Sequence, residues 1–249
     1  MEVARCLSGW RIGRGLFQNG KVQFKPELHD SGKKLVLGQA IPARKGMDGR
    51  KDLDDVLRIV TSHTSTARHI ATKLCRRFID DEPPPAAIDA VASRFSRSDG
   101  SIPEVLRTLF HTEAFRSHRG GKFKQPMHLI ASALRVTDAE TDAGRPLLNF
   151  LTRMGHMPFE YPSPDGYEDA ADAWQGTLLW RWNFAARLGR KQIKGTNLNR
   201  SRLAKRSGGL AKVAAHILNR KPSVEELAAV EASDNPVGLL LASPGFQWS

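Results

Sequence analysis

The only adjacent side chains that suggest acid–base chemistry are those of His29 and Asp30, the single His–acid dipeptide in the chain. An imidazole beside a carboxylate can transfer a proton to or from a substrate, or can contribute ligands to a metal site. The same pair lies in residues 26–32, whose proline, serine and glycine predict a turn. In a turn, Asp30 would accept backbone hydrogen bonds and His29 would pack locally. The dipeptide therefore supports a catalytic hypothesis beside a commoner structural one.

The histidines form no recognisable metal-binding or catalytic motif. None of the eight occurs in an HxxxH or HExxH pattern, which would place two imidazoles on one helix face. The chain also lacks a GxSxG nucleophile motif, a Walker phosphate-binding loop and a GxGxxG loop. The sequence accordingly predicts no metal site and no cofactor.

The positive charge of the chain is concentrated in one segment. Residues 173–224 contain twelve lysines and arginines and no acidic residue, and they account for the whole formal charge of +12. Such a segment can attract a polyanion such as nucleic acid or an acidic glycan, with Trp180 available for stacking. The alternative is a solvated helical surface beside a buried ring. The candidate contacts with a polyanion are Arg181, Arg187, Arg190, Lys191, Lys194, Arg200, Arg202, Lys205 and Arg206.

Cysteine usage and hydropathy leave the compartment open. Cys6 and Cys75 are too few for a disulfide framework and are predicted to be small buried or half-buried thiols. No apolar run approaches the roughly 20 residues that cross a bilayer, so no membrane span is predicted. Residues 1–13 lack the apolar stretch of a signal peptide.

Three of the five tryptophans lie close together at the start of the basic segment. Residues 169–188 are predicted to form one helix, because Trp174, Leu178 and Trp182 recur at four-residue intervals. Trp180 widens the apolar arc, which is typical of a helix packed between other elements. We therefore expect the indole rings to anchor a core.

Further amphipathic segments predict an all-α fold, a multi-helix bundle. The strongest pattern spans residues 67–79, with apolar side chains on one side and basic ones on the other. Residues 22–24 and 35–37 are expected to pair as a small β-ribbon. We expect residues 1–45 to hold the end of a helix plus this ribbon and loop, and residues 46–249 to form the bundle, within one domain. Other helices are predicted near 52–63, 86–95, 101–115, 125–136, 146–155, 210–219, 222–232 and from 235.

Six ordered motifs resemble one protein family: EVARCLSGW, FKPELHDSGKKLVLG, STARHIATKLCRRFIDDEPP, GKFKQPMHLIASALR, PSPDGYEDAADAW with LLWRWNFA, and LLASPGFQ. The chain is similar to the C-terminal half of the bacterial family called domain of unknown function 1800 (DUF1800). The resemblance covers nearly everything outside residues 189–224, where the family pattern is loose. It implies a mostly helical fold, and export in many members. It brings no assigned activity, so it assigns no catalytic residue.

The resemblance also suggests partners. Members are often encoded beside a second uncharacterised exported protein similar to sulfatases and phosphatases. The family's N-terminal half has no counterpart here, so the opening helix would be severed and its apolar face left without its partner. We expect an exposed apolar patch near the N-terminus, with Leu7 and Trp10 not fully buried.

Three functional hypotheses follow. The first is an interaction or scaffold module whose protein partner is the missing half or the neighbouring exported protein. The second is a hydrolase-like enzyme that uses His29 and Asp30 on an anionic or carbohydrate substrate. The third is polyanion binding through residues 173–224. The dense tryptophans and prolines, without a catalytic signature, favour the first.

Overall fold

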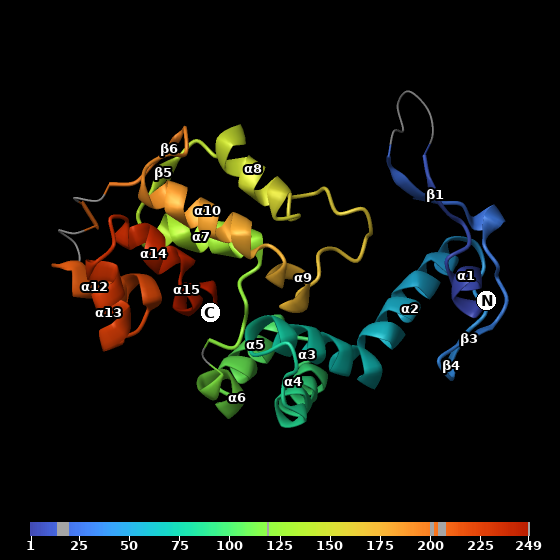
Figure 1. The fold of residues 1–249 in the computed structure, drawn as a ribbon. Helices are drawn as coiled ribbons and strands as arrows, with labels where there is room; N and C mark the ends of the chain where they lie inside the picture. The colour runs from blue at the N-terminus through green and yellow to red at the C-terminus, as the bar shows by residue number, and fades with distance from the viewer. Residues whose placement is uncertain (14–19, 119, 200–201, 204–207, 249) are drawn as a thin grey trace. The chain divides into compact units, whose positions relative to one another are not determined.

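The computed structural model describes residues 1–13, 20–118, 120–199, 202–203 and 208–248 (Figure 1). The chain forms two compact units, described separately below. Unit 1 comprises Met1–Cys75 and Pro84–Thr112, and unit 2 comprises Arg76–Pro83 and Glu113–Ser249. The described elements are mostly helical with three two-stranded sheets, which confirms the predicted all-α class with small β-ribbons. Among the helices of these residues, none is both long and apolar enough to cross a membrane.

Unit 1 opens with a short helix and two β-hairpins. The helix is α1 (Glu2–Cys6). Strand β1 (Trp10–Ile12) pairs with β2 (Val22–Phe24), and β3 (Lys34–Val36) pairs with β4 (Gln39–Ile41), both antiparallel. Of two 3-10 turns, η1 (Pro26–Leu28) lies between β2 and β3, and η2 (Gly46–Arg50) leads from β4 to the helix that follows.

The predicted pairing of residues 22–24 with 35–37 is wrong. Leu37 and Gly38 both have positive φ values, 47° and 78°, as a tight two-residue hairpin turn requires. This turn sends the chain directly back along β3, so β3 pairs with the strand that follows it. Strand β2 is left to pair with β1.

The helices of unit 1 follow from their apolar spacing. α2 (Lys51–Thr61) places Val56 and Ile59 in a small core with Cys6, Val36 and Ile41. α3 (Thr64–Phe78) buries Ala67, Ala71 and Cys75 at four-residue intervals, whereas Phe78, on the predicted apolar side, is 40% exposed. α4 (Pro85–Arg97) and α5 (Ile102–Phe110) each begin at or next to a proline, which the first helical turn tolerates. Leu7 is 39% exposed and Trp10 is half-buried, so neither is enclosed within the chain.

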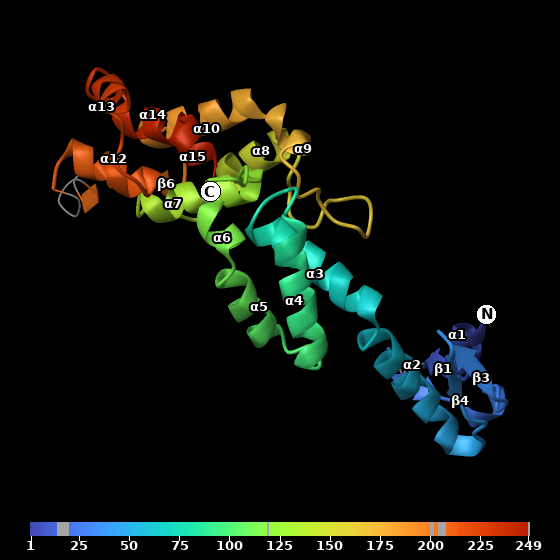
Figure 2. The ribbon, with the colours of Figure 1, turned by 90° about the horizontal axis from the view of Figure 1, so that it is seen from below.

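Unit 2 is a layered set of short helices around one large apolar core. Figures 1 and 2 show α10 and α14 side by side, and buried side chains of α7 and α8 belong to the same core. A two-residue pair, β5 (Glu140–Thr141) with β6 (Thr196–Asn197), joins two loops. The helices are α6 (Glu113–Ser117), α7 (Pro126–Val136), α8 (Arg145–Arg153), α9 (Asp172–Gln175), α10 (Leu178–Gly189), α12 (Leu210–Leu218), α13 (Val224–Glu231), α14 (Pro236–Ala242) and α15 (Pro244–Gln247).

The predicted tryptophan helix is two helices. Gly176 and Thr177 separate α9 from α10, so Trp174 does not share a helical face with Trp182. Trp174 is buried at 4% exposure, Trp180 is half-buried, and Trp182 is 50% exposed. Trp174 packs in a small cluster with Phe123 and Ala171, and Trp180 packs against the large core. The expectation that these rings anchor a core therefore holds for these two and is wrong for Trp182.

The crossing of α10 and α14 depends on the absence of a side chain at Gly189. A Cβ atom there would lie 2.6 Å from the backbone nitrogen of Gly238 and 2.9 Å from its Cα. Asn235 closes the crossing, since its Nδ2 donates to the carbonyl of Ala186 at 3.0 Å. This contact holds the C-terminal half of α10 in place, and that half carries part of the site described next.

Candidate functional site

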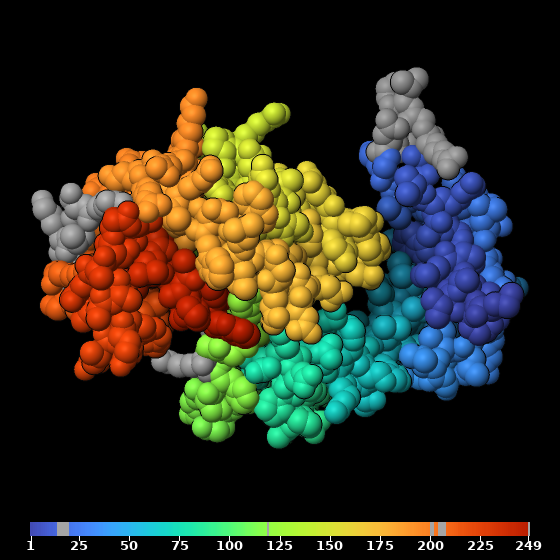
Figure 3. Space-filling view, in the orientation of Figure 1, coloured from blue at the N-terminus to red at the C-terminus, as the bar shows by residue number. Residues whose placement is uncertain are grey.

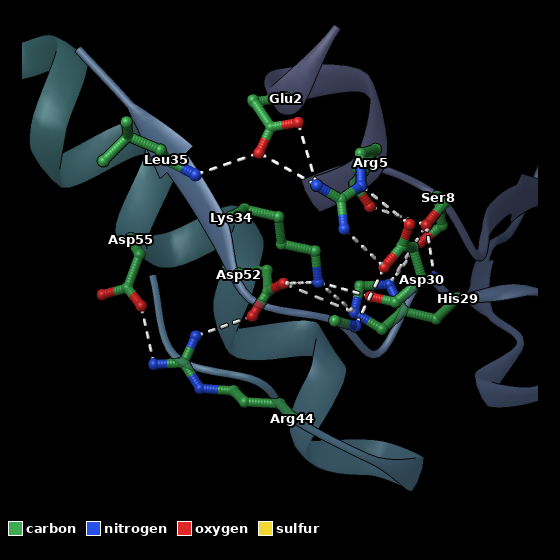
Figure 4. Close-up of polar contacts among 11 residues, drawn as sticks. Glu2, Arg5, Ser8, His29, Asp30, Lys34, Leu35, Arg44, Asp52 and Asp55 are labelled. Atoms are coloured by element: carbon green, nitrogen blue, oxygen red, sulfur yellow. Dashed lines mark hydrogen bonds and ion pairs between the residues drawn. The ribbon is translucent and has the colours of Figure 1, made fainter. Parts of the chain in front are cut away.

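His29 and Asp30 lie in the polar network of unit 1, but they do not bond to each other through their side chains (Figure 4). The Nδ1 of His29 is 2.9 Å from the carbonyl oxygen of Ser8, and its Nε2 is 3.4 Å from Asp52 Oδ2. Asp30 instead accepts from Arg5 Nε at 2.8 Å and from the backbone nitrogen of Gly32 at 2.9 Å. The side chains of His29 and Asp30 therefore contact different groups.

The centre of this network is a buried ion pair. Lys34 Nζ lies 2.6 Å from Asp52 Oδ2 and also donates to the backbone carbonyl of Asp30. The other carboxylate oxygen, Asp52 Oδ1, accepts from Arg44 Nη1 at 2.7 Å. Arg44 reaches on to Asp55, with 2.6 Å between Nη2 and Oδ2. The first turn of α2 thus ties together the loop after η1, strand β3 and the loop after β4.

The electrostatics of Asp30 match its role as an acceptor. The hydrogen bond from Arg5, followed by that from the Gly32 backbone, lowers the pKa of Asp30 to about 2. A carboxyl group held ionised in this way accepts hydrogen bonds but is a poor proton donor near neutral pH.

The imidazole of His29 is closed to substrate. Its side chain is 1% exposed, and a Cβ atom on Gly49 would lie 2.7 Å from Nε2. Both ring nitrogens already contact protein groups. These are the contacts of a structural network that fastens β3 to α2, and they leave no space for a reacting group.

The candidate polyanion contacts lie in different environments: some are buried, some are paired with acids and some are exposed. Arg181 has no exposed surface, while Arg190 and Arg202 pair with Asp234 and Asp138 at 3.0 Å and 2.9 Å. Arg187, Lys191 and Lys194 are exposed without a described ion pair. Three further candidates, Arg200, Lys205 and Arg206, lie outside the described residues.

Arg187 belongs to a polar pocket between α8 and α10, which we call the α8–α10 pocket. Its volume is about 470 Å³. Figure 3 shows the two segments adjoining at the surface, α8 in yellow-green and α10 in orange. The lining residues are Pro146, Asn149, Phe150 and Arg153 from α8, Trp180, Asn183 and Arg187 from α10, and Gln192 and Ile193 from the loop that follows.

Helical spacing places the polar side chains of this pocket. Asn149 and Arg153 lie four residues apart on α8, and Asn183 and Arg187 lie four apart on α10, so each pair shares a helix face. The floor is apolar, since Phe150 packs edge-on against Phe184 with ring centroids 5.5 Å apart.

The end of α10 turns Gln192 into the same pocket. Lys191 adopts a left-handed conformation with φ of 59°, and its backbone nitrogen donates to the carbonyl of Leu188 at 3.0 Å. The nitrogen of Gln192 donates to the carbonyl of Arg187 at 2.8 Å. This is the Schellman pattern of a helix end, and it reverses the chain so that Gln192 and Ile193 complete the wall.

The charge of the pocket is uncompensated. The lining contains two guanidinium groups and three carboxamides and no carboxylate. Within the described part of the chain, neither Arg153 nor Arg187 has an acidic partner. The guanidinium carbon of Arg153 lies 4.3 Å from the centroid of the Trp180 ring, a cation–π contact that holds the arginine at the rim. The arrangement can bind an oxyanion by charge-assisted hydrogen bonds.

The sequence indicated part of this site. Arg187 and Trp180 stood out in the basic segment, and the pocket includes both. Arg153, Asn149 and Gln192 were not singled out. The four-residue spacing of Asn149 and Arg153 was the available signal for α8, but the contact between α8 and α10 is tertiary. Among the described residues, no group of three or more His, Cys, Asp or Glu side chains is placed to share a metal ion.

Comparison with known proteins identifies the family of the chain. No curated protein and no solved structure matches it. The model of one family, described as "Protein of unknown function (DUF1800)", matches residues 1–248. The chain therefore belongs to the DUF1800 family, as the six sequence motifs indicated.

Proposed function

We propose that this DUF1800 protein is a binding module and that the α8–α10 pocket of unit 2 holds an acidic saccharide. One observation carries the proposal: Arg153 and Arg187, from different helices, converge with three carboxamides on a pocket without a carboxylate. This proposal is closer to the polyanion-binding hypothesis for residues 173–224 than to the protein-partner role that the sequence favoured.

The mixture of groups favours a saccharide over a bare anion. Guanidinium groups only donate hydrogen bonds, and they suit the oxygens of a sulfate or carboxylate. The amides of Asn149, Asn183 and Gln192 also present carbonyl oxygens, which need a donor from the ligand. Hydroxyl groups both donate and accept, so a sugar with an acidic substituent satisfies both sets. The volume of about 470 Å³ lies within the range of small-ligand sites.

The same geometry disfavours a nucleic-acid track. Stacking of bases needs an exposed aromatic face, but Trp180 is half-buried and Arg153 covers its ring. Of the described basic candidates, Arg181 is buried and Arg190 is paired with an acid, so these two do not extend the positive surface.

Calorimetric titration tests the proposal with four probes: a sulfated tetrasaccharide, a uronic-acid tetrasaccharide, a neutral tetrasaccharide and single-stranded DNA of matched charge. We expect the acidic saccharides to bind and the neutral one not to bind. Arg153→Gln and Arg187→Gln should each weaken binding about tenfold or more, the loss of one charge-assisted contact. Asn183→Ala should weaken saccharide binding but leave the affinity for inorganic sulfate unchanged.

The matched control is Arg135→Gln, which removes the same charge from an exposed position of α7 outside the pocket. An equal loss in this variant would show that net charge, and not the pocket, attracts the ligand. Tighter binding of DNA than of either acidic saccharide would also reject the proposal.

A second candidate is an interaction with a protein helix, favoured by an apolar groove elsewhere in unit 2. The groove has a volume of about 390 Å³, and Trp182 and Leu239 in its lining are 50% and 39% exposed. Helix α13 forms one wall and carries no basic residue; its Glu226 is paired with Arg220, whereas Glu225 and Glu231 are exposed and have no ion pair among the described residues. Charge complementarity therefore favours a basic amphipathic helix as occupant.

Fluorescence anisotropy with two labelled helical peptides, one of leucine and lysine and one of leucine and glutamate, tests this second role. The basic peptide should bind, and Trp182→Ala should weaken it about tenfold. Phe159→Ala, which removes an exposed aromatic ring outside the groove, serves as the control. Equal binding of both peptides would reject the assignment.

A further inference from the structure

The loop between α8 and α9 borders a third pocket of unit 2, with a lining unlike that of the α8–α10 pocket. Its volume is about 390 Å³. Three of its side chains are aromatic and two are carboxylates, and it contains no lysine or arginine. The lining residues are Met154, Gly155, Glu160, Tyr161, Pro162, Tyr167, Glu168, Ala173 and Trp174, and we call this site the aromatic pocket.

Hydrogen bonds fix the rings of this pocket in place. Tyr167 Oη donates to the carbonyl of Met157 at 2.6 Å, and Trp174 Nε1 donates to the carbonyl of Glu168 at 3.0 Å. Gly155, with φ of 70°, turns the chain at the end of α8 so that His156 stacks on Trp174, with centroids 4.9 Å apart and planes at 23°. The aromatic wall is therefore organised before any ligand arrives.

The rings meet at an angle. Tyr161 and Tyr167 have centroids 4.7 Å apart and planes inclined by 57°, and Tyr167 and Trp174 are 6.0 Å apart and inclined by 50°. Trp174 is 4% exposed and lies behind the tyrosines, so Tyr161 and Tyr167 supply the accessible ring surface. Both tyrosines are partly exposed, so part of this aromatic surface is open to solvent.

Two glutamates give the aromatic pocket a negative charge, although the chain as a whole is positive. Glu160 and Glu168 are exposed, and in the described part of the chain neither side chain has a cationic partner. In a protein with a formal charge of +12, a lining with two carboxylates and no basic group selects for a positive ligand.

We propose that the aromatic pocket binds an alkylated ammonium group, such as a trimethylammonium or a methylated lysine. The negative faces of aromatic rings attract a cation, and alkyl groups on the nitrogen lower its desolvation cost while filling the space between rings. The two glutamates add charge complementarity at the rim. A neutral saccharide, the other common occupant of aromatic pockets, would find acceptors in this lining but no guanidinium or amide donor. The proposal is independent of the α8–α10 pocket.

Calorimetry with choline and its neutral isostere 3,3-dimethyl-1-butanol tests the inference on the full chain. We expect choline to bind and the isostere to bind at least tenfold more weakly, because the two differ only in the charge of the central atom. Glu160→Gln combined with Glu168→Gln should weaken choline binding about threefold to tenfold. Equal binding of choline and the isostere would overturn the proposal.

Two substitutions at Tyr161 separate the role of the ring from that of folding. Tyr161→Phe keeps the ring face and should retain choline binding within about twofold, whereas Tyr161→Leu should lose at least tenfold. Phe159→Ala, in the same loop and fully exposed, is the control and should change nothing. If the phenylalanine variant loses as much as the leucine variant, the ring face is not the binding element.

Discussion

Lys34 and Asp52 form an ion pair in which neither side chain has any exposed surface, with 2.6 Å between Nζ and Oδ2. Removing one partner of such a pair leaves the other charge buried and uncompensated. Asp52→Ala should therefore destabilise unit 1 by about 3–5 kcal/mol. Asp52→Asn should cost nearly as much, because it keeps the shape but leaves Lys34 without a counter-charge and Arg44 with only Asp55. Hydrogen exchange of the amides of α2 measures the loss.

The control for this prediction is a nearby exposed pair. Lys51 and Asp48 are 65% and 68% exposed and lie 2.8 Å apart. Asp48→Ala should destabilise unit 1 far less than Asp52→Ala, because water screens the charges. A similar small effect of Asp52→Asn would contradict the role assigned to the buried pair.

Local sequence patterns predicted the helices well where one periodicity held throughout. The spacing of Ala67, Ala71 and Cys75 defines the buried face of α3 without further information. The break between α9 and α10 was missed, because apolar spacing continues across Gly176 and a helix interior can tolerate one glycine. The pairing of β3 was missed because Leu37 replaces the Asn or Asp usual before Gly38 in a two-residue turn.

The sites could be predicted only in part, for a physical reason. A basic segment without acids is visible in the sequence, and it contains Arg187. Residues far away in the sequence decide which of its basic side chains can reach a ligand. Arg190 is paired with Asp234, and Arg181 is buried in the interior. Arg153 joins the pocket from a helix some distance back along the chain, and no local spacing reveals that contact. His29 is similar, because its burial depends on Asp52 and Gly49.

Acid should weaken helix α13 through Glu226. The hydrogen bonds from Arg220 and from the backbone of Ser223 lower the pKa of this carboxyl to about 2 from its ordinary 4.5. The folded pKa lies below the unfolded one, so this stabilisation is complete above about pH 4.5 and is lost as the pH falls towards 2. The amide chemical shifts of Ala228 and Ala229, followed by NMR from pH 6 to pH 2, should report fraying of the helix.

Glu226→Gln should remove this pH dependence, because a glutamine side chain has no carboxylate that takes up a proton as the helix frays. Glu231→Gln, on the same helix but outside the capping box formed by Ser223 and Glu226, should behave as the unmodified chain. An acid response that persists in Glu226→Gln would assign the effect to another group.

The two thiols should be unreactive in the folded protein. Cys6 and Cys75 are both buried and free. Burial raises the pKa of Cys75 to about 11 and also raises that of Cys6. Since the thiolate is the reactive form, little of either group reacts at pH 7.5. A disulfide reagent should label both cysteines only after denaturant is added, and rapid labelling of the native chain would contradict the structure.

Substitution of Arg181 tests whether this buried arginine of the basic segment contributes to folding or to ligand binding. Burial lowers the pKa of its guanidinium to about 10, and its Nη2 atom has no described hydrogen-bond partner. Its remaining contacts are Nε to Thr177 Oγ1 at 2.8 Å, Nη1 to Gln247 Oε1 at 3.1 Å, and the ring of Phe123, whose centroid is 4.2 Å from the guanidinium carbon.

An apolar side chain of similar length should replace it well. Arg181→Met removes a buried charge that lacks an acidic partner, so we expect stability to change by no more than about 1 kcal/mol in either direction. Arg181→Ala leaves a cavity as well and should cost about 2–4 kcal/mol. Four of the five tryptophans lie in unit 2, so urea unfolding followed by tryptophan emission reports this difference.

Affinity for an acidic saccharide should be the same in Arg181→Met as in the unmodified chain, because Arg181 has no exposed surface. A tenfold loss of affinity in this stable variant would place the buried guanidinium in the binding site after all.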